Sequence, residues 1–172
     1  PMRIAGLVAH HSGARFVATG DPSRGIARGT AVSAIIRLLD QARTEITRYS
    51  PAQAADALRA GATLVDLRPT EYRWRFGEIP GAVAVSRHVL EWRLDVTSPW
   101  HIKELRPGDT GQEIILICNE GYTSSLAAHQ LKVQLGLSDV KDVIGGFAAW
   151  RDAGFPVMSR LGQPAEPLVE QS

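Results

Sequence analysis

Short apolar runs alternate with amphipathic stretches along most of the chain. The runs predict strands over 63–67, 82–85, 113–118 and 140–144, and the amphipathic stretches predict helices over 51–60, 89–94, 124–135 and 147–153. Gly136 follows the third of these helices and Gly154 the fourth, where glycine commonly ends a helix. Because strands separated by helices are joined by right-handed crossovers, the pattern predicts the α/β fold class, with a mainly parallel central sheet flanked by helices.

The N-terminal part of the chain has a different pattern. Residues 1–29 hold five glycines and no sustained period, so loop or weak structure is expected there. A helical pattern over 30–49 places six apolar residues on one face, namely Ala31, Ile35, Leu38, Leu39, Ala42 and Ile46. This helix either packs on the domain, as we expect, or forms a homodimer contact. The predicted organisation is an extension over 1–48, a domain over 49–160 and a disordered tail over 161–172.

Composition narrows the class of protein. The 172 residues are 44% hydrophobic and 22% charged, as in an ordinary globular domain, and the net charge of +1 predicts neither nucleic-acid nor membrane binding. Residues 1–50 hold seven Arg against three acids, which we interpret as a solvated extension, with a surface for an anionic partner as the alternative. No apolar run approaches the ~18–20 residues that span a bilayer. With a lone cysteine and no secretory segment, the cytoplasm is the expected location.

Cys118, the only cysteine, lies where the strand over 113–118 gives way to the helix over 124–135. At such a junction, backbone N–H groups and the positive end of a helix dipole can face the thiol. Both favour the thiolate, which is the reactive form of cysteine. Free cysteines also pack as small hydrophobic residues, so burial in the core is the alternative. The residues after Cys118 favour a nucleophile.

The loop over 118–124, called the reactive loop below, has features suited to an anionic ligand. Gly121 lets the backbone approach a ligand closely. Thr123 or Ser124 is expected to cap the following helix, and the N–H groups of residues 119–124 can point inward as an anion nest. Parallel α/β sheets bind ligands at the carboxyl ends of their strands, and the reactive loop follows such an end.

Four short motifs follow one another between residues 64 and 157. They are Leu64-Val65-Asp66-Leu67-Arg68 with Glu71-Tyr72, the turn Glu78-Ile79-Pro80-Gly81-Ala82, the Cys-x-x-Gly-x-x-Ser pattern of the reactive loop, and Gly145-Gly146-Phe147-Ala148-Ala149-Trp150 with Gly154-Phe155-Pro156-Val157. In this order they resemble the motifs of the rhodanese domain, the sulfurtransferase fold. The resemblance covers somewhat over half of the chain.

The resemblance implies a sulfurtransferase with Cys118 as the catalytic nucleophile. Cys118 would take sulfur from thiosulfate or a thiol persulfide as a cysteine persulfide, and cyanide or a thiol would collect it. The implied partners are a small-molecule sulfur donor and a thiol acceptor from outside the chain, which has no second cysteine. No cofactor or metal is expected, and His10-His11 lack neighbouring ligands. The expected substrate-binding residues are Asn119, Glu120, Gly121, Tyr122, Thr123, Ser124 and Arg68.

Two departures from the family pattern bear on the substrate. The reactive loop contains no Arg or Lys and does contain Glu120, so thiosulfate, a dianion, is expected to bind poorly unless charge comes from elsewhere. Candidates for that charge are Arg68, Arg73, Arg75, Arg87 and Arg93, although Arg68 is better explained by an ion pair with Asp66 or Glu71. Glu78 stands where the family often has His, and this change should leave the chemistry unaltered.

Two alternatives to a sulfurtransferase remain open. Phosphatase or arsenate reductase chemistry in this fold needs a guanidinium six residues after the cysteine, and Ser124 occupies that position. The other alternative is a non-enzymatic persulfide carrier or interaction module of sulfur metabolism, which could dock through the N-terminal helix.

Overall fold

The computed structural model describes residues 33–108 and 111–159. Its centre is a five-stranded sheet in the order β1-β5-β4-β2-β3. Every pair of neighbouring strands is parallel, as the alternating pattern predicted. The strands are β1 (Arg48–Tyr49), β2 (Thr63–Asp66), β3 (Val83–Ala84), β4 (Ile114–Ile117) and β5 (Val140–Val143).

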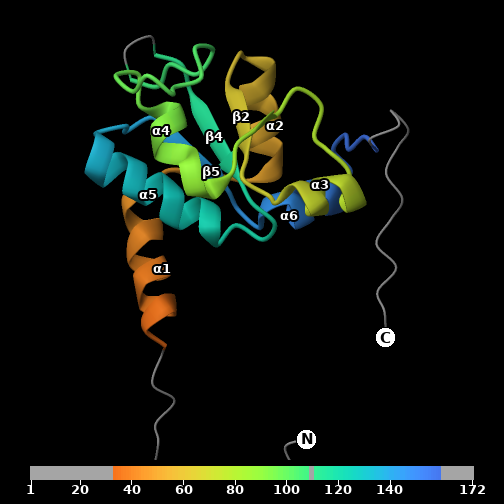
Figure 1. Ribbon diagram of the computed structural model, residues 1–172. Coiled ribbons are helices and arrows are strands. Elements are labelled where there is room, and N and C mark those ends of the chain that lie inside the picture. The colour runs from red at the N-terminus through yellow and green to blue at the C-terminus, as the bar shows by residue number, and fades with distance from the viewer. Residues whose placement is uncertain (1–32, 109–110, 160–172) are drawn as a thin grey trace, which may run out of the picture. The chain divides into compact units, whose positions relative to one another are not determined.

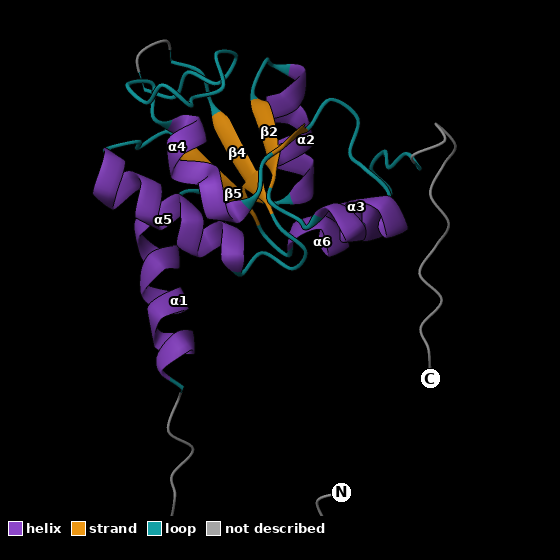
Figure 2. Cartoon of the chain, viewed as in Figure 1, coloured by secondary structure: helices purple, strands orange, loops and turns teal. Residues whose placement is uncertain are grey.

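Helices cover both faces of the sheet (Figures 1 and 2). They are α1 (Ala34–Glu45), α2 (Pro51–Arg59), α3 (Thr70–Phe76), α4 (Leu90–Leu94) with the 3-10 turn η1 (Arg87–Val89) before it, α5 (Thr123–Leu135) and α6 (Gly146–Asp152). Buried residues of α4 and α5 pack on one face of the sheet, and those of α2 and α6 pack on the other. The arrangement is therefore a three-layer α/β fold.

The central strand shows why the fold forms. All four residues of β4 are apolar and fully buried. Because successive side chains of a strand point to opposite faces, Ile114 and Leu116 join the core beneath α4 and α5, whereas Ile115 and Ile117 join the core beneath α2 and α6. A continuous apolar run is what a strand buried on both faces requires.

The N-terminal helix differs from the prediction. A helix was expected over 30–49, but α1 ends at Glu45 and the following Arg48–Tyr49 forms β1 beside β5. Ile46, the residue after the helix, is already extended, with φ −116° and ψ 156°. Ile46 and Thr47 are β-branched, which favours extended backbone over helix. The last part of the expected helix is therefore an edge strand of the sheet.

The predicted apolar face of this helix is buried only in part. Leu39 and Ala42 are buried, and α1 packs along α5. Ile35 and Leu38, which belong to the same predicted face, are 54% and 50% exposed. The C-terminal half of α1 thus packs on the domain, as expected, and the N-terminal half presents apolar side chains to solvent.

Other predicted elements agree with the structure to within a few residues. Ser50 and Gln53 form a capping box at the start of α2, with Pro51 in the first turn. Gly136 ends α5 in the left-handed conformation, at φ 68°. Helix α3 was not predicted, because it buries none of its residues and so has no apolar face for a periodicity to reveal.

Some expectations concern parts of the chain outside the described residues. These are the loop structure over 1–29, the His10-His11 pair and the disordered tail over 161–172. In residues 33–108 and 111–159, none of the helices combines the length and the apolar character that crossing a bilayer requires.

Candidate active site

The reactive loop connects the carboxyl end of β4 to the first turn of α5. Cys118 follows the last residue of β4, and its side chain is nearly buried, with 7% of the residue exposed. Its Sγ atom accepts hydrogen bonds from the backbone N–H of Gly121 at 3.2 Å and of Ser124 at 3.3 Å. Two donors at the start of a helix suit a sulfur atom that carries negative charge.

Gly121 is needed for this loop shape. Its φ is +75°, a conformation that residues with a side chain rarely adopt. A Cβ atom at this position would lie 2.9 Å from both the backbone nitrogen of Gly145 and the carbonyl oxygen of Val143. The loop therefore packs directly against the turn between β5 and α6, with no room for a side chain.

The Gly145-Gly146 turn holds the loop from the other side. A Cβ atom on Gly146 would lie 2.5 Å from the carbonyl oxygen of Cys118. The first N–H groups of α6 bind the loop, because Phe147 donates to the carbonyl of Cys118 at 2.8 Å and Ala148 donates to that of Asn119 at 2.9 Å. Close packing and two hydrogen bonds thus fix the backbone on either side of the thiol.

Arginines that the sequence analysis did not consider bind the back of the loop. Arg43 of α1 donates to the carbonyl of Gly121 at 2.9 Å, and Arg48 of β1 reaches the same oxygen at 3.4 Å. The hydroxyl of Ser125 is 2.8 Å from this carbonyl and also accepts from Arg43 at 3.3 Å. The guanidinium carbon of Arg43 lies 5.3 Å from the centre of the Tyr122 ring.

A buried carboxylate lies behind the thiol. Asp142 of β5 is fully buried and forms an ion pair with Arg48, with N–O distances of 2.8 and 3.1 Å. Its Oδ2 atom accepts from Ser125 at 2.7 Å and from Ser124 at 3.4 Å. The hydroxyl of Ser124 also lies 3.3 Å from Sγ of Cys118. A continuous polar chain therefore links Arg48 to the reactive sulfur.

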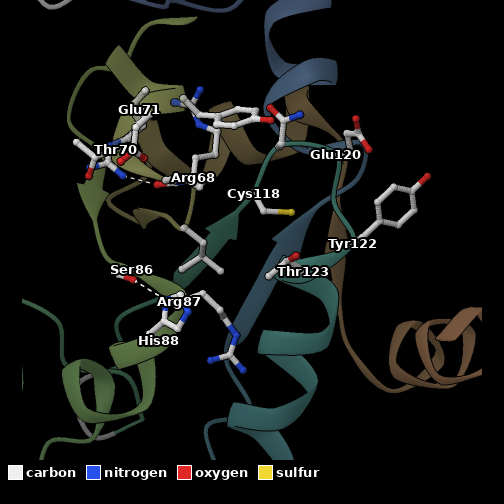
Figure 3. Close-up of a pocket in the computed structure, with 15 residues that line it drawn as sticks. Arg68, Thr70, Glu71, Ser86, Arg87, His88, Cys118, Glu120, Tyr122 and Thr123 are labelled. Atoms are coloured by element: carbon white, nitrogen blue, oxygen red, sulfur yellow. Dashed lines mark hydrogen bonds between the residues drawn. The ribbon is translucent and has the colours of Figure 1, made fainter. Parts of the chain in front are cut away.

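The thiol opens into a pocket with a volume of about 720 Å³ (Figure 3). The lining residues come from the reactive loop, from the segment after β2 and from η1. They are Leu67, Arg68, Pro69, Thr70, Glu71, Tyr72, Arg73, Ser86, Arg87, His88, Cys118, Asn119, Glu120, Tyr122 and Thr123. The structure thus brings Arg68 and most of the predicted loop residues to one pocket, while Gly121 and Ser124 contact the sulfur from behind.

The side chains of Glu120 and Tyr122 are exposed and extend from the loop away from Cys118 (Figure 3). Thr123 is exposed as well. The expected cap by Thr123 or Ser124 is not formed: α5 starts at Thr123, its N-cap residue is Tyr122, and no side chain caps it. The hydroxyl of Ser124 faces the sulfur instead, so a cap is replaced by a contact with the thiol.

Arg68 lines the pocket, and its guanidinium is bound within the protein through Nε and Nη2, whereas Nη1 has no hydrogen-bond partner in the part of the chain that the structure describes. It forms a buried ion pair with Asp66, with an N–O distance of 2.7 Å, and donates to the carbonyl of Gly77 at 3.0 Å. The guanidinium carbon lies 3.5 Å from the centre of the Phe147 ring. Of the two expected partners, Asp66 and Glu71, Arg68 pairs with Asp66, and its stacking on Phe147 ties the β2–α3 connection to α6.

The other arginines proposed as sources of positive charge either bind groups within the protein or lie outside the pocket. Arg87 is held by Glu91 at 2.7 Å and by Gln130 at 2.6 Å. Arg73 donates to the carbonyl of Arg68 and to the hydroxyl of Thr70. The lining of the pocket does not include Arg75 and Arg93. Among the described residues, no group of three or more His, Cys, Asp and Glu side chains could hold a metal ion.

Sequence reasoning missed Arg43, Arg48, Ser125 and Asp142. One indication was available, because Asp142 is a carboxylate in the middle of the strand predicted over 140–144. A buried charge of this kind needs a partner. The partner could not be identified, because Arg48 lies 94 residues away along the chain.

Comparison with known proteins places this chain in a family. The rhodanese-like domain family matches residues 50–153. The thiosulfate sulfurtransferase GlpE of Pseudomonas syringae is 32% identical over 108 residues, which cover 63% of this chain and 90% of the relative. The GlpE protein of Pseudomonas fluorescens is 28% identical over 121 residues, covering 70% and 98% of the two chains.

A solved structure with a TM-score of 0.65 and 32% identity covers 74% of this chain and 96% of its own. It is a protein of unknown function from Rhodopseudomonas palustris, described as a possible tyrosine phosphatase. The named relatives support a sulfurtransferase in general. Since the family match covers more than half of the chain, this protein belongs to the rhodanese-like domain family.

Proposed function

We propose that this protein is a sulfurtransferase that carries sulfur as a persulfide on Cys118. The observation that carries the proposal is the position of Sγ, which faces a pocket and accepts hydrogen bonds from the N–H groups of Gly121 and Ser124. These donors stabilise negative charge on sulfur, much as an oxyanion hole stabilises it on oxygen. The relatives named thiosulfate sulfurtransferase support the same activity.

The reaction has two transfer steps. The Cys118 thiolate attacks the outer sulfur of a donor, an S–S bond forms, and the donor's own bond to that sulfur breaks. The leaving group, sulfite from thiosulfate or a thiolate from a persulfide, departs with the electron pair. An acceptor thiolate or cyanide then attacks the outer sulfur of the Cys118 persulfide, which releases the Cys118 thiolate. The acceptor comes from outside the chain, because Cys118 is its only cysteine.

The pocket favours a thiol persulfide over thiosulfate as the donor. Its volume of about 720 Å³ accommodates a group larger than an inorganic anion. The guanidinium groups of Arg68, Arg73 and Arg87 face carboxylates within the protein, and the loop itself contains no Arg or Lys. The pocket therefore offers little uncompensated positive charge to bind a dianion such as thiosulfate. A thiol persulfide is a larger molecule, and its organic part can occupy the remaining volume of the pocket.

Phosphatase chemistry is not part of the proposal, although one solved relative is described as a possible tyrosine phosphatase. A phosphoryl group needs a guanidinium on the far side of the loop to bind its equatorial oxygens. Ser124 occupies that position here, and its hydroxyl contacts Sγ and Asp142. The reactive loop therefore lacks the guanidinium that phosphatase chemistry requires.

The test compares the wild type with Cys118→Ser. Both proteins are assayed with thiosulfate and with a thiol persulfide as donors, using cyanide and a thiol as acceptors, and intact mass is recorded after incubation with each donor. We expect turnover and the added mass of one sulfur atom in the wild type alone. Equal rates in the two proteins would rule out the mechanism. An adduct without turnover would favour the non-enzymatic persulfide carrier, and no adduct with any donor would favour an interaction module.

A further inference from the structure

The reactive loop is held by residues that precede the segment matching the family. The match begins at residue 50, whereas Arg43 and Arg48 lie on α1 and β1. Neither arginine lines the pocket. Both nevertheless reach the carbonyl oxygen of Gly121, and Arg48 binds the carboxylate behind the thiol. This segment therefore contacts the site from the side opposite to the substrate.

We propose that Arg43 and Arg48 are positioning residues that keep the reactive loop, and with it the thiolate of Cys118, ready for attack. The proposal rests on the function proposed above for Cys118. The proposal gives the segment before residue 50 a role in the reaction. The two arginines supply positive charge on the side of the loop opposite to the pocket, whereas the loop itself contains no Arg or Lys.

The first part of the argument is the geometry of Gly121. On one side of this residue, its N–H donates to Sγ of Cys118. On the other side, its carbonyl accepts from Arg43 and Arg48 and lies 2.8 Å from the hydroxyl of Ser125. Glycine is the most flexible residue of the backbone, so an unrestrained Gly121 would let its N–H turn away from the sulfur. The arginines hold the carbonyl side of Gly121, in addition to its packing against the Gly145-Gly146 turn.

The second part is the chain of hydroxyls beneath the sulfur. Asp142 has only acceptor atoms, and the Ser125 hydroxyl is its nearer serine partner, at 2.7 Å. The Ser124 hydroxyl lies 3.4 Å from Asp142 and 3.3 Å from Sγ, and it has one proton to donate. Arg48 neutralises much of the charge of Asp142, so the carboxylate attracts this proton less strongly. Ser124 can then donate to the thiolate.

The third part is charge. Residues 118–124 include one carboxylate, Glu120, and no Arg or Lys. The group behind the loop combines two guanidinium groups with one carboxylate, Asp142, which leaves one positive charge in excess. Asp142 is fully buried, and in such surroundings charges act more strongly than they do in water. The excess charge therefore favours negative sulfur at Cys118.

Contacts between α1 and α5 hold Arg43 in place beside the reactive loop. At its C-terminal end, Glu45 binds His129 of α5 at 3.1 Å, and Lys132 donates to the backbone carbonyl of Glu45. The His129 hydrogen bond lowers the pKa of Glu45 below its usual value, so the carboxylate is charged at neutral pH. These contacts hold the last turn of α1, which carries Arg43, against α5.

The experiment measures how fast iodoacetamide alkylates Cys118 at pH 7 in the full chain, which requires no sulfur donor. Two variants are compared with the wild type, Arg43→Gln and Arg48→Lys. Arg43 has no acidic partner among the described residues, so its replacement leaves no buried charge unpaired. Arg48→Lys keeps a charge beside Asp142 but loses the planar fork that reaches both Asp142 and Gly121. Arg59→Gln, an exposed change on α2, is the control.

We expect a loss of about fivefold in the alkylation rate for Arg43→Gln and about threefold for Arg48→Lys, since each loses one charge-assisted hydrogen bond to the loop. Arg59→Gln should react at the wild-type rate. In the sulfurtransferase assay the losses should appear in kcat and leave KM unchanged, because neither arginine contacts the pocket. A rise in KM with kcat unchanged would overturn the positioning role.

Alkylation rates equal to that of the wild type in both variants would also overturn this proposal, and they would leave the proposed function untouched. Conversely, a wild type that forms no persulfide would refute the proposed function, whereas the alkylation rates would still report on the loop. If Arg43→Gln does not fold, the alkylation rate of Arg48→Lys alone decides: a loss of about threefold supports the proposal, and the wild-type rate overturns it.

Discussion

Two arginine–aspartate pairs, each with a buried carboxylate, lie close to the reactive loop, and they do different things. Arg68 and Asp66 are two residues apart, and their side chains are 0% and 1% exposed. Arg48 and Asp142 are 94 residues apart, face each other across the β1–β5 pairing, and are 17% and 0% exposed. The first pair fixes the connection after β2, whereas the second touches the loop that holds the thiol.

The difference shows how a local pair and a long-range pair serve the same site. The partners of the local pair are two residues apart at the end of β2, so they are neighbours before the sheet forms, although their burial requires α6 and Phe147. The long-range pair forms only once β1 has joined the edge of the sheet. Through Ser124 and Ser125 it makes the surroundings of Cys118 depend on the N-terminal segment.

Breaking the local pair should have the largest effect on stability. Arg68→Met leaves the Asp66 carboxylate buried without its partner, so the free energy of unfolding should fall by about 3–5 kcal/mol. Urea denaturation monitored by circular dichroism measures the change. The double variant Asp66→Asn/Arg68→Met removes both charges, and the amide oxygen introduced at position 66 would still accept the backbone N–H of residue 68. It should recover more than half of the loss, and a double variant no more stable than Arg68→Met would contradict a charge-based explanation.

Breaking the long-range pair should lower stability less than breaking the local pair does, and it should lower the rate of sulfur transfer more. For Arg48→Gln we expect the free energy of unfolding to fall by about 2 kcal/mol, because Arg48 is partly exposed and Asp142 keeps two hydroxyl donors. The rate of sulfur transfer should fall as well, whereas Arg68→Met should affect the rate mainly through unfolding. Both are measured at a temperature where each variant remains folded. A fully active Arg48→Gln protein would remove the functional distinction between the two pairs.

Both arginine–aspartate pairs leave the reactive loop without an Arg or Lys of its own. Placing a positive charge at position 120 tests whether that absence limits the binding of thiosulfate. Glu120→Arg should lower KM for thiosulfate by about threefold, which is the size expected for an exposed charge at a pocket rim. Steady-state assays with Glu120→Gln as the matched control separate the loss of repulsion from the gain of attraction. If KM is unchanged or higher in the Arg variant, the side chain of Glu120 does not face the bound anion.

The smallest effect concerns the strand that carries Arg48. The hydroxyl of Tyr49 donates to Glu113 at 2.5 Å, and this hydrogen bond, aided by burial, raises the pKa of Tyr49 to about 12 from 10.0. Because the folded pKa is the higher one, this contribution to stability is full below pH 10 and is lost as the pH rises toward 12. Absorbance of tyrosinate should show one late-titrating tyrosine that is missing in Tyr49→Phe. Identical titrations of the two proteins, scaled to the number of tyrosines, would refute the hydrogen bond.

Much of the fold and the core of the site followed from local sequence. The apolar run of β4 predicts a strand buried on both faces, and Gly121 and Gly136 predict backbone conformations that other residues avoid. The pair between Arg68 and Asp66 was expected for the same reason, since its partners are near neighbours in the chain. Cys118 could be placed at the end of a strand before any tertiary contact was known.

Tertiary structure decided what lies behind the thiol. The pattern after Glu45 was interpreted as helix, because two residues form a strand only where an existing edge offers them hydrogen bonds. That edge is β5, which comes almost a hundred residues later in the chain. Arg43, Arg48 and Asp142 meet only after both segments have docked. Local pattern thus determined where Cys118 lies, and long-range packing determined which charges surround it.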